Sequence, residues 1–284
     1  MRILITGASG RLGSALNAVF SARGHDVTAL SRDQLDMTDF AATRARITSA
    51  QPELVLNPAA WTDVDGCARE PERATRINGF GAQNIALAAV EVGAAVVYVS
   101  TNEVFDGRLN RAYYEYDVPN PPNAYGYSKW VGEQGTMQVN PKHYIVRSAW
   151  LFANGGKNFI QTILNAAQAG DSLRVVANEV ANPTYTNDLA DSIAELVESG
   201  RYGTYHLVNE GWTSRYDFAR YALDRAGFTG TPMEKISTFE WNRLSTPPPY
   251  CGLVNLAGAS VGVKLRPWQE AVDAFLRADG LLAS

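Results

Sequence analysis

The stretch that decides the fold is the first thirteen residues, Met1-Arg2-Ile3-Leu4-Ile5-Thr6-Gly7-Ala8-Ser9-Gly10-Arg11-Leu12-Gly13. A continuous apolar run at 3–5 is typical of a buried parallel strand. The glycines that follow permit a tight turn, a close approach of the backbone to a ligand and close packing of the next helix. The stretch therefore predicts a strand, a turn and a helix whose N-terminal N–H groups point at a phosphate.

The glycine spacing on its own is a weak signal, because three of 24 glycines can fall in this pattern in an ordinary loop. It is Gly-x-x-Gly-x-x-Gly rather than the Gly-x-Gly-x-x-Gly of the dinucleotide fingerprint. This looser form resembles that of the short-chain dehydrogenase/reductase superfamily, in which the first strand also begins at the start of the chain.

Size and composition narrow the class of protein. The 284 residues, 46% of them hydrophobic, suffice for one large α/β domain or a nucleotide-binding domain with a smaller cap. A net charge of −4 supplies no basic field, which argues against nucleic-acid binding. No apolar run approaches the ~20 residues of a membrane span, and no signal peptide precedes the first strand. Cys67 and Cys251 form no C-x-x-C pair, so we expect a reducing compartment, the cytoplasm.

The segment after the glycine turn predicts one βαβ unit and the choice of dinucleotide. Apolar residues at helical spacing run to Phe20, and Gly24 precedes a second strand at 26–30. At the end of that strand an acidic residue binds the ribose of NAD, whereas an arginine binds the 2′-phosphate of NADP. Arg32 stands there. NADP(H) is therefore favoured, and NAD(H) stays open because Arg32 can also be a solvated loop charge.

Two further strands, predicted at 53–57 and 95–99, end in residues suited to the ligand crevice of a parallel sheet. The small residues Ala59 and Ala60 follow the first of them and would let a cofactor lie against the backbone, although an ordinary loop has the same composition. Thr101 follows the second and places a hydroxyl group at the same edge.

Tyr125 and Lys129 are four residues apart on a predicted helix and therefore share a face. A nearby ammonium group lowers the pKa of a tyrosine from about 10, so the tyrosine can exchange a proton with a carbonyl oxygen near neutral pH. Thr101 would supply a second donor to that oxygen. Such a pair is common by chance among 13 tyrosines, but after a glycine turn it favours hydride transfer to a carbonyl group.

Several further stretches carry a family resemblance when they are taken in order. They are the glycine motif, residues 35–39, 57–65, 100–101, 104–107, the pair Tyr125 and Lys129, and residues 147–150, 156–159 and 182–190. Together they resemble the dTDP-4-dehydrorhamnose reductases, extended short-chain reductases that reduce the 4-keto group of a nucleotide-linked 6-deoxysugar. The resemblance is close over residues 1–225 and weak beyond them.

This resemblance implies roles for individual residues. It implies a catalytic group of Thr101, Tyr125 and Lys129. It implies cofactor contacts at Gly7, Gly10, Arg11, Leu12 and Gly13 around the pyrophosphate, Asp36 and Met37 near the adenine, and Ala59 and Ala60 near the ribose. It implies substrate contacts at Asn102, Glu103 and Trp150, although core packing explains the tryptophan equally well.

Two departures from the family pattern bear on the substrate. Asn102 and Glu103 stand where the family has aspartate and tyrosine, so contacts with the substrate differ there. The stretch Thr246-Pro247-Pro248-Pro249-Tyr250-Cys251-Gly252-Leu253 replaces an Arg-Pro segment. If the family arginine positions the sugar nucleotide, the substrate here differs from dTDP-4-dehydrorhamnose.

Two other functions stay open. Thr101-Asn102-Glu103 is similar to the Thr-Asp-Glu of nucleotide-sugar dehydratases, a class grouped here with the epimerases, but an asparagine cannot act as the acid of a dehydration. A non-catalytic, cofactor-binding regulatory subunit is the other alternative, because reductase folds are reused in this way. Retention of the threonine, tyrosine and lysine argues against it.

The predicted architecture is α/β, a Rossmann-type doubly wound parallel sheet with a smaller, mainly C-terminal substrate cap. The resemblance implies a dinucleotide-binding domain at 1–154 and 184–209 and a cap at 155–183 and 210–284. No metal is expected, because the three histidines lack ligand spacing and Ser14 and Ala15 stand where a family acid would be wanted. The expected partner is a nucleotide-sugar substrate, with neither nucleic acid nor membrane; a homodimer is left open.

Overall fold

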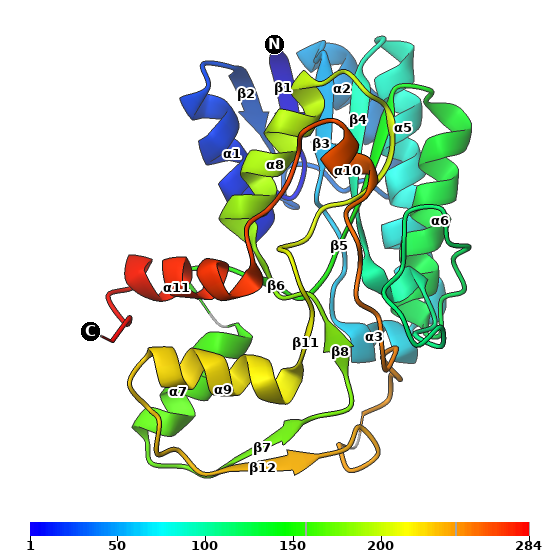
Figure 1. Ribbon diagram of the computed structural model, residues 1–284. Helices are drawn as coiled ribbons and strands as arrows, with labels where there is room; N and C mark the ends of the chain where they lie inside the picture. Colours follow the sequence, from blue (N-terminus) through cyan, green and yellow to red (C-terminus); the bar gives the residue numbers. More distant parts are fainter. Residues whose placement is uncertain (157, 242, 284) are drawn as a thin grey trace.

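The computed structural model describes residues 1–156, 158–241 and 243–283, and its centre is a six-stranded parallel sheet (Figure 1). The strand order is β10-β5-β4-β3-β1-β2. Their bounds are β1 (Arg2–Ile5), β2 (Asp26–Ala29), β3 (Leu54–Asn57), β4 (Ala95–Thr101), β5 (His143–Ser148) and β10 (Gly203–His206). Because β2 lies on one side of β1 and β3 on the other, the winding direction reverses between β1 and β3. Open parallel sheets bind ligands in the crevice at such a reversal.

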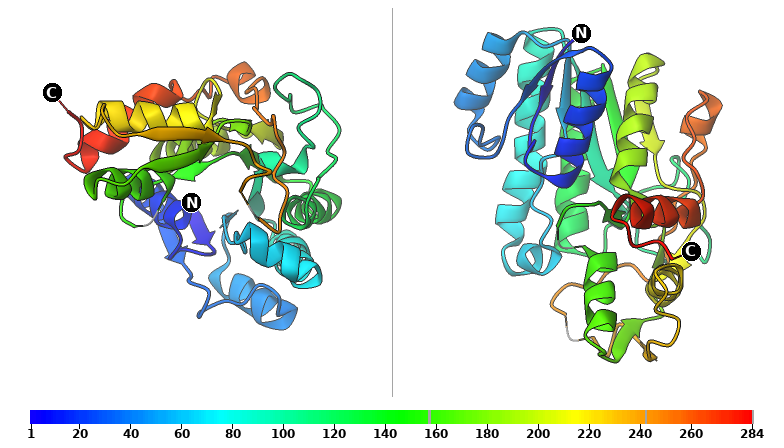
Figure 2. Two further views of the ribbon diagram at one scale, coloured as in Figure 1. Left: turned by 90° about the horizontal axis from the view of Figure 1, so that it is seen from below. Right: turned by 90° about the vertical axis from the view of Figure 1, so that its left-hand side faces the viewer.

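Helices cover both faces of the sheet because successive side chains of each strand point to opposite sides. Ile3 and Ile5 pack on one face under α1 (Arg11–Ala22) and α8 (Thr186–Glu198), which lie side by side (Figure 2). Leu4 packs on the other face under α2 (Phe40–Ala50) and α5 (Gly81–Glu91). Next to α5 lies α6 (Ala124–Val139). The predicted doubly wound Rossmann-type sheet is confirmed.

The segment between β3 and β5 holds several short elements in addition to β4, α5 and α6. They are α3 (Val64–Arg69), α4 (Pro71–Ala74), a π-helical turn (Thr75–Phe80) and a 3₁₀ turn (Asn102–Val104). The π turn leads into α5 and carries Asn78, whose amide donates to the Ser128 hydroxyl on α6 at 2.9 Å. Single π turns are frequent at functional sites, and this one is hydrogen-bonded to the helix that bears Tyr125.

A smaller part lies below the carboxyl edge of the sheet in Figure 1 and has its own apolar core. Its helices are α7 (Phe159–Gln168), α9 (Arg215–Arg225) and α11 (Trp268–Ala278). Three short strand pairs accompany them, β6 (Leu151–Phe152) with β9 (Thr184–Tyr185), β7 (Leu173–Val176) with β12 (Met233–Ile236), and β8 (Val180–Ala181) with β11 (Thr213–Ser214).

The chain returns to the large sheet once more near its end. Helix α10 (Ala257–Ser260) packs beside β10, and Val263 and Leu265 join the core that contains Ile3. Leu276 of α11 then belongs to the smaller core. Within the described residues, no helix has the length and apolarity to cross a bilayer.

Candidate active site

The glycine turn lies against the loop that follows β3. Gly7 has φ +58°, and a first side-chain carbon placed on it would lie 3.0 Å from both Cα and Cβ of Ala59. A carbon placed on Gly13 would overlap the Gly7 carbonyl oxygen, so α1 can start here only with glycine. We call Gly7, Gly10, Gly13, Ala59 and Ala60 the cofactor edge. It occupies the reversal point between β1 and β3.

The start of α1 is open to an anionic group. Gly10 is the N-cap residue of α1, and no side chain caps the helix. The first N–H groups of the helix are therefore available to a phosphate. Of the first two residues of α1, Arg11 is exposed and Leu12 is buried in the core.

The residues predicted around the adenosine lie at the ends of β2 and α2. Arg32 is exposed just after β2. The Asp36 carboxylate accepts hydrogen bonds from the backbone N–H of Thr38 at 2.9 Å and from its hydroxyl at 2.8 Å, which lowers the pKa of Asp36. Met37 is buried against Gly81, so this turn is fixed from both sides.

Thr101 lies next to Tyr125 where β4 ends against α6, and Lys129 follows one turn further along that helix. A side-chain carbon on Gly126 would overlap the Glu103 carbonyl oxygen, so α6 packs directly on the 3₁₀ turn after β4. This close packing brings the Thr101 hydroxyl into hydrogen-bonding reach of Tyr125, where it moderates the pKa of the phenol. The Lys129 ammonium lies 4.1 Å from the centre of the Tyr98 ring, and its side chain is only 2% exposed.

The prediction that Lys129 lowers the pKa of Tyr125 is wrong. Burial, followed by the negative charge of Glu103, raises the pKa of Tyr125 well above its usual value. Burial also lowers the pKa of Lys129 to about 7, although Glu133 one turn along α6 opposes the shift. The charge of the lysine therefore depends on pH near neutrality, and desolvation decides both ionisations.

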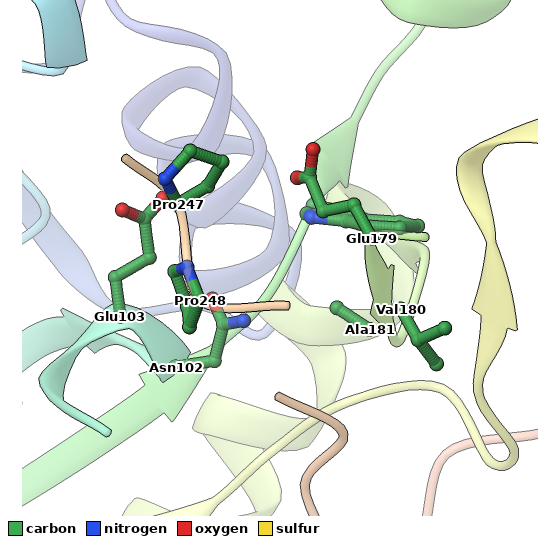
Figure 3. Close-up of a pocket in the computed structure, with 8 residues that line it drawn as sticks. Asn102, Glu103, Glu179, Val180, Ala181, Pro247 and Pro248 are labelled. Carbon is green, nitrogen blue, oxygen red and sulfur yellow. The ribbon is translucent and has the colours of Figure 1, made fainter. Parts of the chain in front are cut away.

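Next to Thr101 lies a pocket that we call the substrate pocket (Figure 3). It is lined by Asn102, Glu103, Trp150, Glu179, Val180, Ala181, Pro247 and Pro248. Glu103 accepts a hydrogen bond from the Asn123 amide at 2.7 Å, and burial raises the pKa of Glu103. The same amide donates to the carbonyl oxygen of Thr246 at 3.1 Å, which ties the proline-rich loop to α6.

Trp150 contributes its indole ring to the pocket and has an unusual backbone with φ 41°. The Arg215 guanidinium group lies 3.7 Å from the centre of this ring. Arg215 also pairs with Glu179, its Nη2 atom being 3.3 Å from Oε1. The tryptophan is therefore part of a charged pocket wall and also packs on Phe218 of the smaller core.

The structure brings Thr101 and Tyr125 together, places the Lys129 ammonium over the Tyr98 ring, and sets Asn102, Glu103 and Trp150 around one pocket. Sequence reasoning missed Asn123, Glu179 and Arg215. Asn123 had a signal, since it directly precedes a predicted helix and caps the Gly126 N–H at 2.8 Å. The other two had none, because they come from separate segments of the smaller part.

Among the residues that the structure describes, no group of three or more His, Cys, Asp or Glu side chains is arranged to hold a metal ion. The motif residue Lys157 lies outside the described residues.

Comparisons with known proteins agree over the whole length. Residues 1–280 match the family model described as RmlD substrate binding domain. The chain is 36% identical over 275 residues to the dTDP-4-dehydrorhamnose reductase of Mycolicibacterium smegmatis, covering 95% of this chain and 84% of that protein. It is 37% identical to the dTDP-4-keto-6-deoxy-D-glucose reductase of Streptomyces niveus, covering 80% of this chain and 79% of that protein.

A solved structure gives the same result. The crystal structure of dTDP-4-dehydrorhamnose reductase from Bacillus anthracis in complex with NADP aligns with a TM-score of 0.94 at 32% identity, covering 98% of this chain and 99% of that one. Sequence, fold and the arrangement of Thr101, Tyr125 and Lys129 lead to one conclusion: the chain belongs to the dTDP-4-dehydrorhamnose reductase family.

Proposed function

We propose that this protein is an NADPH-dependent reductase of the 4-keto group of a dTDP-linked 6-deoxysugar. The observation that carries the proposal is the meeting of Thr101 and Tyr125 at the end of β4, beside the cofactor edge. The names of the relatives support it, since each is a reductase of a dTDP-linked sugar.

The cofactor edge fits a dinucleotide. A side chain at Gly7 or Gly13 would strike the backbone around it, so the loop keeps a smooth surface that a pyrophosphate can approach. The uncapped start of α1 would hold the pyrophosphate, and Arg32 the 2′-phosphate that distinguishes NADPH from NADH. When bound there, NADPH supplies the hydride.

In this mechanism Tyr125 donates a proton to the O4 oxygen and Thr101 donates a second hydrogen bond to it. The Tyr125 phenol is protonated at neutral pH, which is the form a reduction requires, and the hydrogen bond from Thr101 opposes the rise of its pKa. Lys129, on the next turn of α6, would take part through its ammonium form.

The dehydratase alternative has less support. The Asn102 side chain donates to the carbonyl oxygen of Cys251 at 3.2 Å and accepts from the Thr101 hydroxyl at 3.3 Å. It thus holds two segments together and carries no acidic proton for a leaving hydroxyl.

We extend the proposal to the organisation of the protein. Residues 1–154 and 184–209 would bind the dinucleotide, and 155–183 and 210–284 would form the substrate cap, with the stretch around Val263 lying on the large sheet. A homodimer and a cytoplasmic location stay predictions from the sequence.

The test is NADPH oxidation with dTDP-4-keto-6-deoxyglucose, supplied with and without the 3,5-epimerase that produces the L-sugar. Turnover only with the epimerase places the protein in rhamnose synthesis. Turnover without it identifies the D-sugar as the substrate. No turnover with either sugar, despite tight NADPH binding, contradicts the proposal and favours a regulatory role.

A further inference from the structure

The ion pair between Arg215 and Glu179 is looser than the arginine–carboxylate pairs that use both carboxylate oxygens. Both contacts of Arg215, from Nε at 3.4 Å and from Nη2 at 3.3 Å, reach the same oxygen of Glu179. By contrast, Arg147 binds both oxygens of Glu133, at 2.9 and 2.8 Å. Two-oxygen contacts of 2.6 to 2.9 Å also join Arg266 to Asp188, Arg225 to Asp273 and Arg111 to Asp117.

The loose pair leaves one edge of the guanidinium group without a protein partner. Within the described residues Nη1 of Arg215 makes no hydrogen bond, although only 24% of the side chain is exposed. Burial lowers the pKa of Arg215, although the negative charges of Glu179 and Glu103 oppose the shift. In the part of the chain that the structure describes, Nη1 is not one of the buried nitrogens that lack a partner, so it faces solvent and is open to an incoming acceptor.

The aromatic neighbours hold this guanidinium group in place. It lies 3.7 Å from the centre of the Trp150 ring and 5.4 Å from that of Phe159. Stacking fixes the plane of the group, while Glu179 occupies its Nε side. The remaining edge presents two parallel N–H donors, the geometry that matches phosphate oxygens.

The position of Arg215 indicates which ligand its free edge contacts. Trp150 and Glu179, which hold it, both line the substrate pocket beside Asn102 and Glu103. A second weakly held guanidinium group is near, because Arg243 makes one contact of 3.5 Å with Asp65 and influences Arg215 electrostatically. Two neighbouring arginines repel each other unless an anion lies between them.

We propose that Arg215 binds the diphosphate of the nucleotide-sugar substrate through its Nη1 edge and thereby selects nucleoside-diphosphate ligands. The proposal rests on the proposed function, since the diphosphate is the anionic group of that substrate. It also explains how a chain without the family's Arg-Pro segment near residue 246 can bind such a substrate. The arginine is then supplied by the start of α9 instead.

The test is calorimetric titration of the NADP⁺-bound protein with dTDP and, separately, with thymidine. Arg215→Ala should weaken dTDP binding about 10- to 100-fold, as expected for loss of charge-assisted hydrogen bonds, and change thymidine binding less than about twofold. Arg215→Lys keeps the charge without the fork and should lie in between. Arg225→Ala is the matched control, because it lies on the same helix but pairs with Asp273 away from the pocket.

Either of two results would overturn the proposal. One is an unchanged affinity of Arg215→Ala for dTDP. The other is an equal loss for dTDP and thymidine, which would mean that Arg215 supports Trp150 at a base site. If Arg215→Ala does not fold, Arg215→Lys decides by the same two criteria. Failure of the proposed function is separate, because it would appear as no NADPH oxidation while dTDP binding still depended on Arg215.

Discussion

The cofactor edge and the substrate pocket lie at the same edge of the sheet, but they are built in different ways. The cofactor edge consists of two short segments in backbone contact, with Gly7 against Ala59 and Gly13 against the Gly7 carbonyl. The substrate pocket collects single side chains from separate segments, among them Glu103, Trp150 and Glu179. Steric exclusion fixes the first region, whereas the second can change one side chain at a time.

This difference predicts that the two regions tolerate substitution unequally. A substitution at Gly13 would displace the helix, so the cofactor edge tolerates little change. A substitution at Glu103 alters the lining of the pocket and removes the hydrogen bond from the Asn123 amide. Substitutions in one region, or in the catalytic group between them, should leave the properties of the other region unchanged unless the two are linked.

The largest effect should come from the catalytic group. Tyr125→Phe removes the proposed proton donor, so kcat should fall about 10²- to 10⁴-fold. The dissociation constant for NADPH should stay the same, because the cofactor edge is intact. Stopped-flow NADPH oxidation and fluorescence titration measure the two quantities.

The control for this variant is Tyr127→Phe. Tyr127 lies two residues along the same helix with its ring exposed, so it should keep the wild-type rate. A Tyr125→Phe protein with the wild-type rate would remove Tyr125 from the mechanism.

The next effect is a pH dependence caused by Lys129. Burial lowers its pKa to about 7, so its ammonium form is lost as the pH rises through that value. If the ammonium form is active, kcat/KM for NADPH should fall about tenfold per pH unit above 7, because this ratio reports the free enzyme. Lys129→Met should be slow and show no such inflection. A flat wild-type profile between pH 6 and 9 would contradict the role given to Lys129.

The same loss of a proton from Lys129, which lowers activity as the pH rises, should raise the free energy of unfolding. The unfolded lysine keeps its proton up to a pKa of about 10.4, whereas the folded one loses it above about 7. The unfolded state therefore binds more protons in this window, and the contribution of Lys129 to the free energy of unfolding should rise with pH. Thermal melts of wild type and Lys129→Met across the window isolate this contribution.

A smaller effect is expected at the cofactor edge. Arg32→Ala should reduce the preference for NADPH over NADH about tenfold, because a 2′-phosphate would lose its cation. KM for the sugar should not change. Arg46→Ala, another exposed arginine on the neighbouring α2, is the control, and the ratio of kcat/KM for the two cofactors is the measurement. An unchanged ratio would identify Arg32 as a solvated loop charge.

Sequence alone could predict the cofactor edge because its determinants are local. An apolar strand, spaced glycines and a helix follow one another within thirteen residues, and the sheet they begin is present. Helical spacing likewise placed Tyr125 and Lys129 on one face. The ionisation of that pair could not be read from spacing, since it depends on how deeply Lys129 is buried and on Glu103 from another segment.

The wall of the substrate pocket that contains Glu179 and Arg215 could not be predicted from the sequence. The strands β8 and β11 have two residues each, too short for an alternating pattern to be visible. Their pairing brings Glu179 and Arg215, which flank these strands, to the same wall of the pocket. A contact between residues 36 positions apart depends on tertiary packing and leaves no local motif.

The smallest effect should arise at the residue that joins the two regions. Asn123 caps the helix that bears Tyr125, with Oδ1 accepting from the Gly126 N–H at 2.8 Å. Its Nδ2 donates to Glu103 at 2.7 Å and to the Thr246 carbonyl at 3.1 Å. Asn123→Ala should lower the free energy of unfolding by about 1 kcal/mol through loss of the cap. KM for the sugar should rise about threefold, because Glu103 and the proline-rich loop lose a shared donor.

A helix cap remote from the pocket is the control that separates the loss of stability from the rise in KM. Asp39 caps α2 by accepting from the Ala42 N–H at 3.0 Å, and it has no contact with the pocket. Asp39→Ala should cost a similar free energy of unfolding and leave KM for the sugar unchanged. If both variants raised KM equally, global stability would explain the effect. If only Asn123→Ala raises it, the cap of the catalytic helix also shapes the substrate pocket, and the two regions are linked through one amide group.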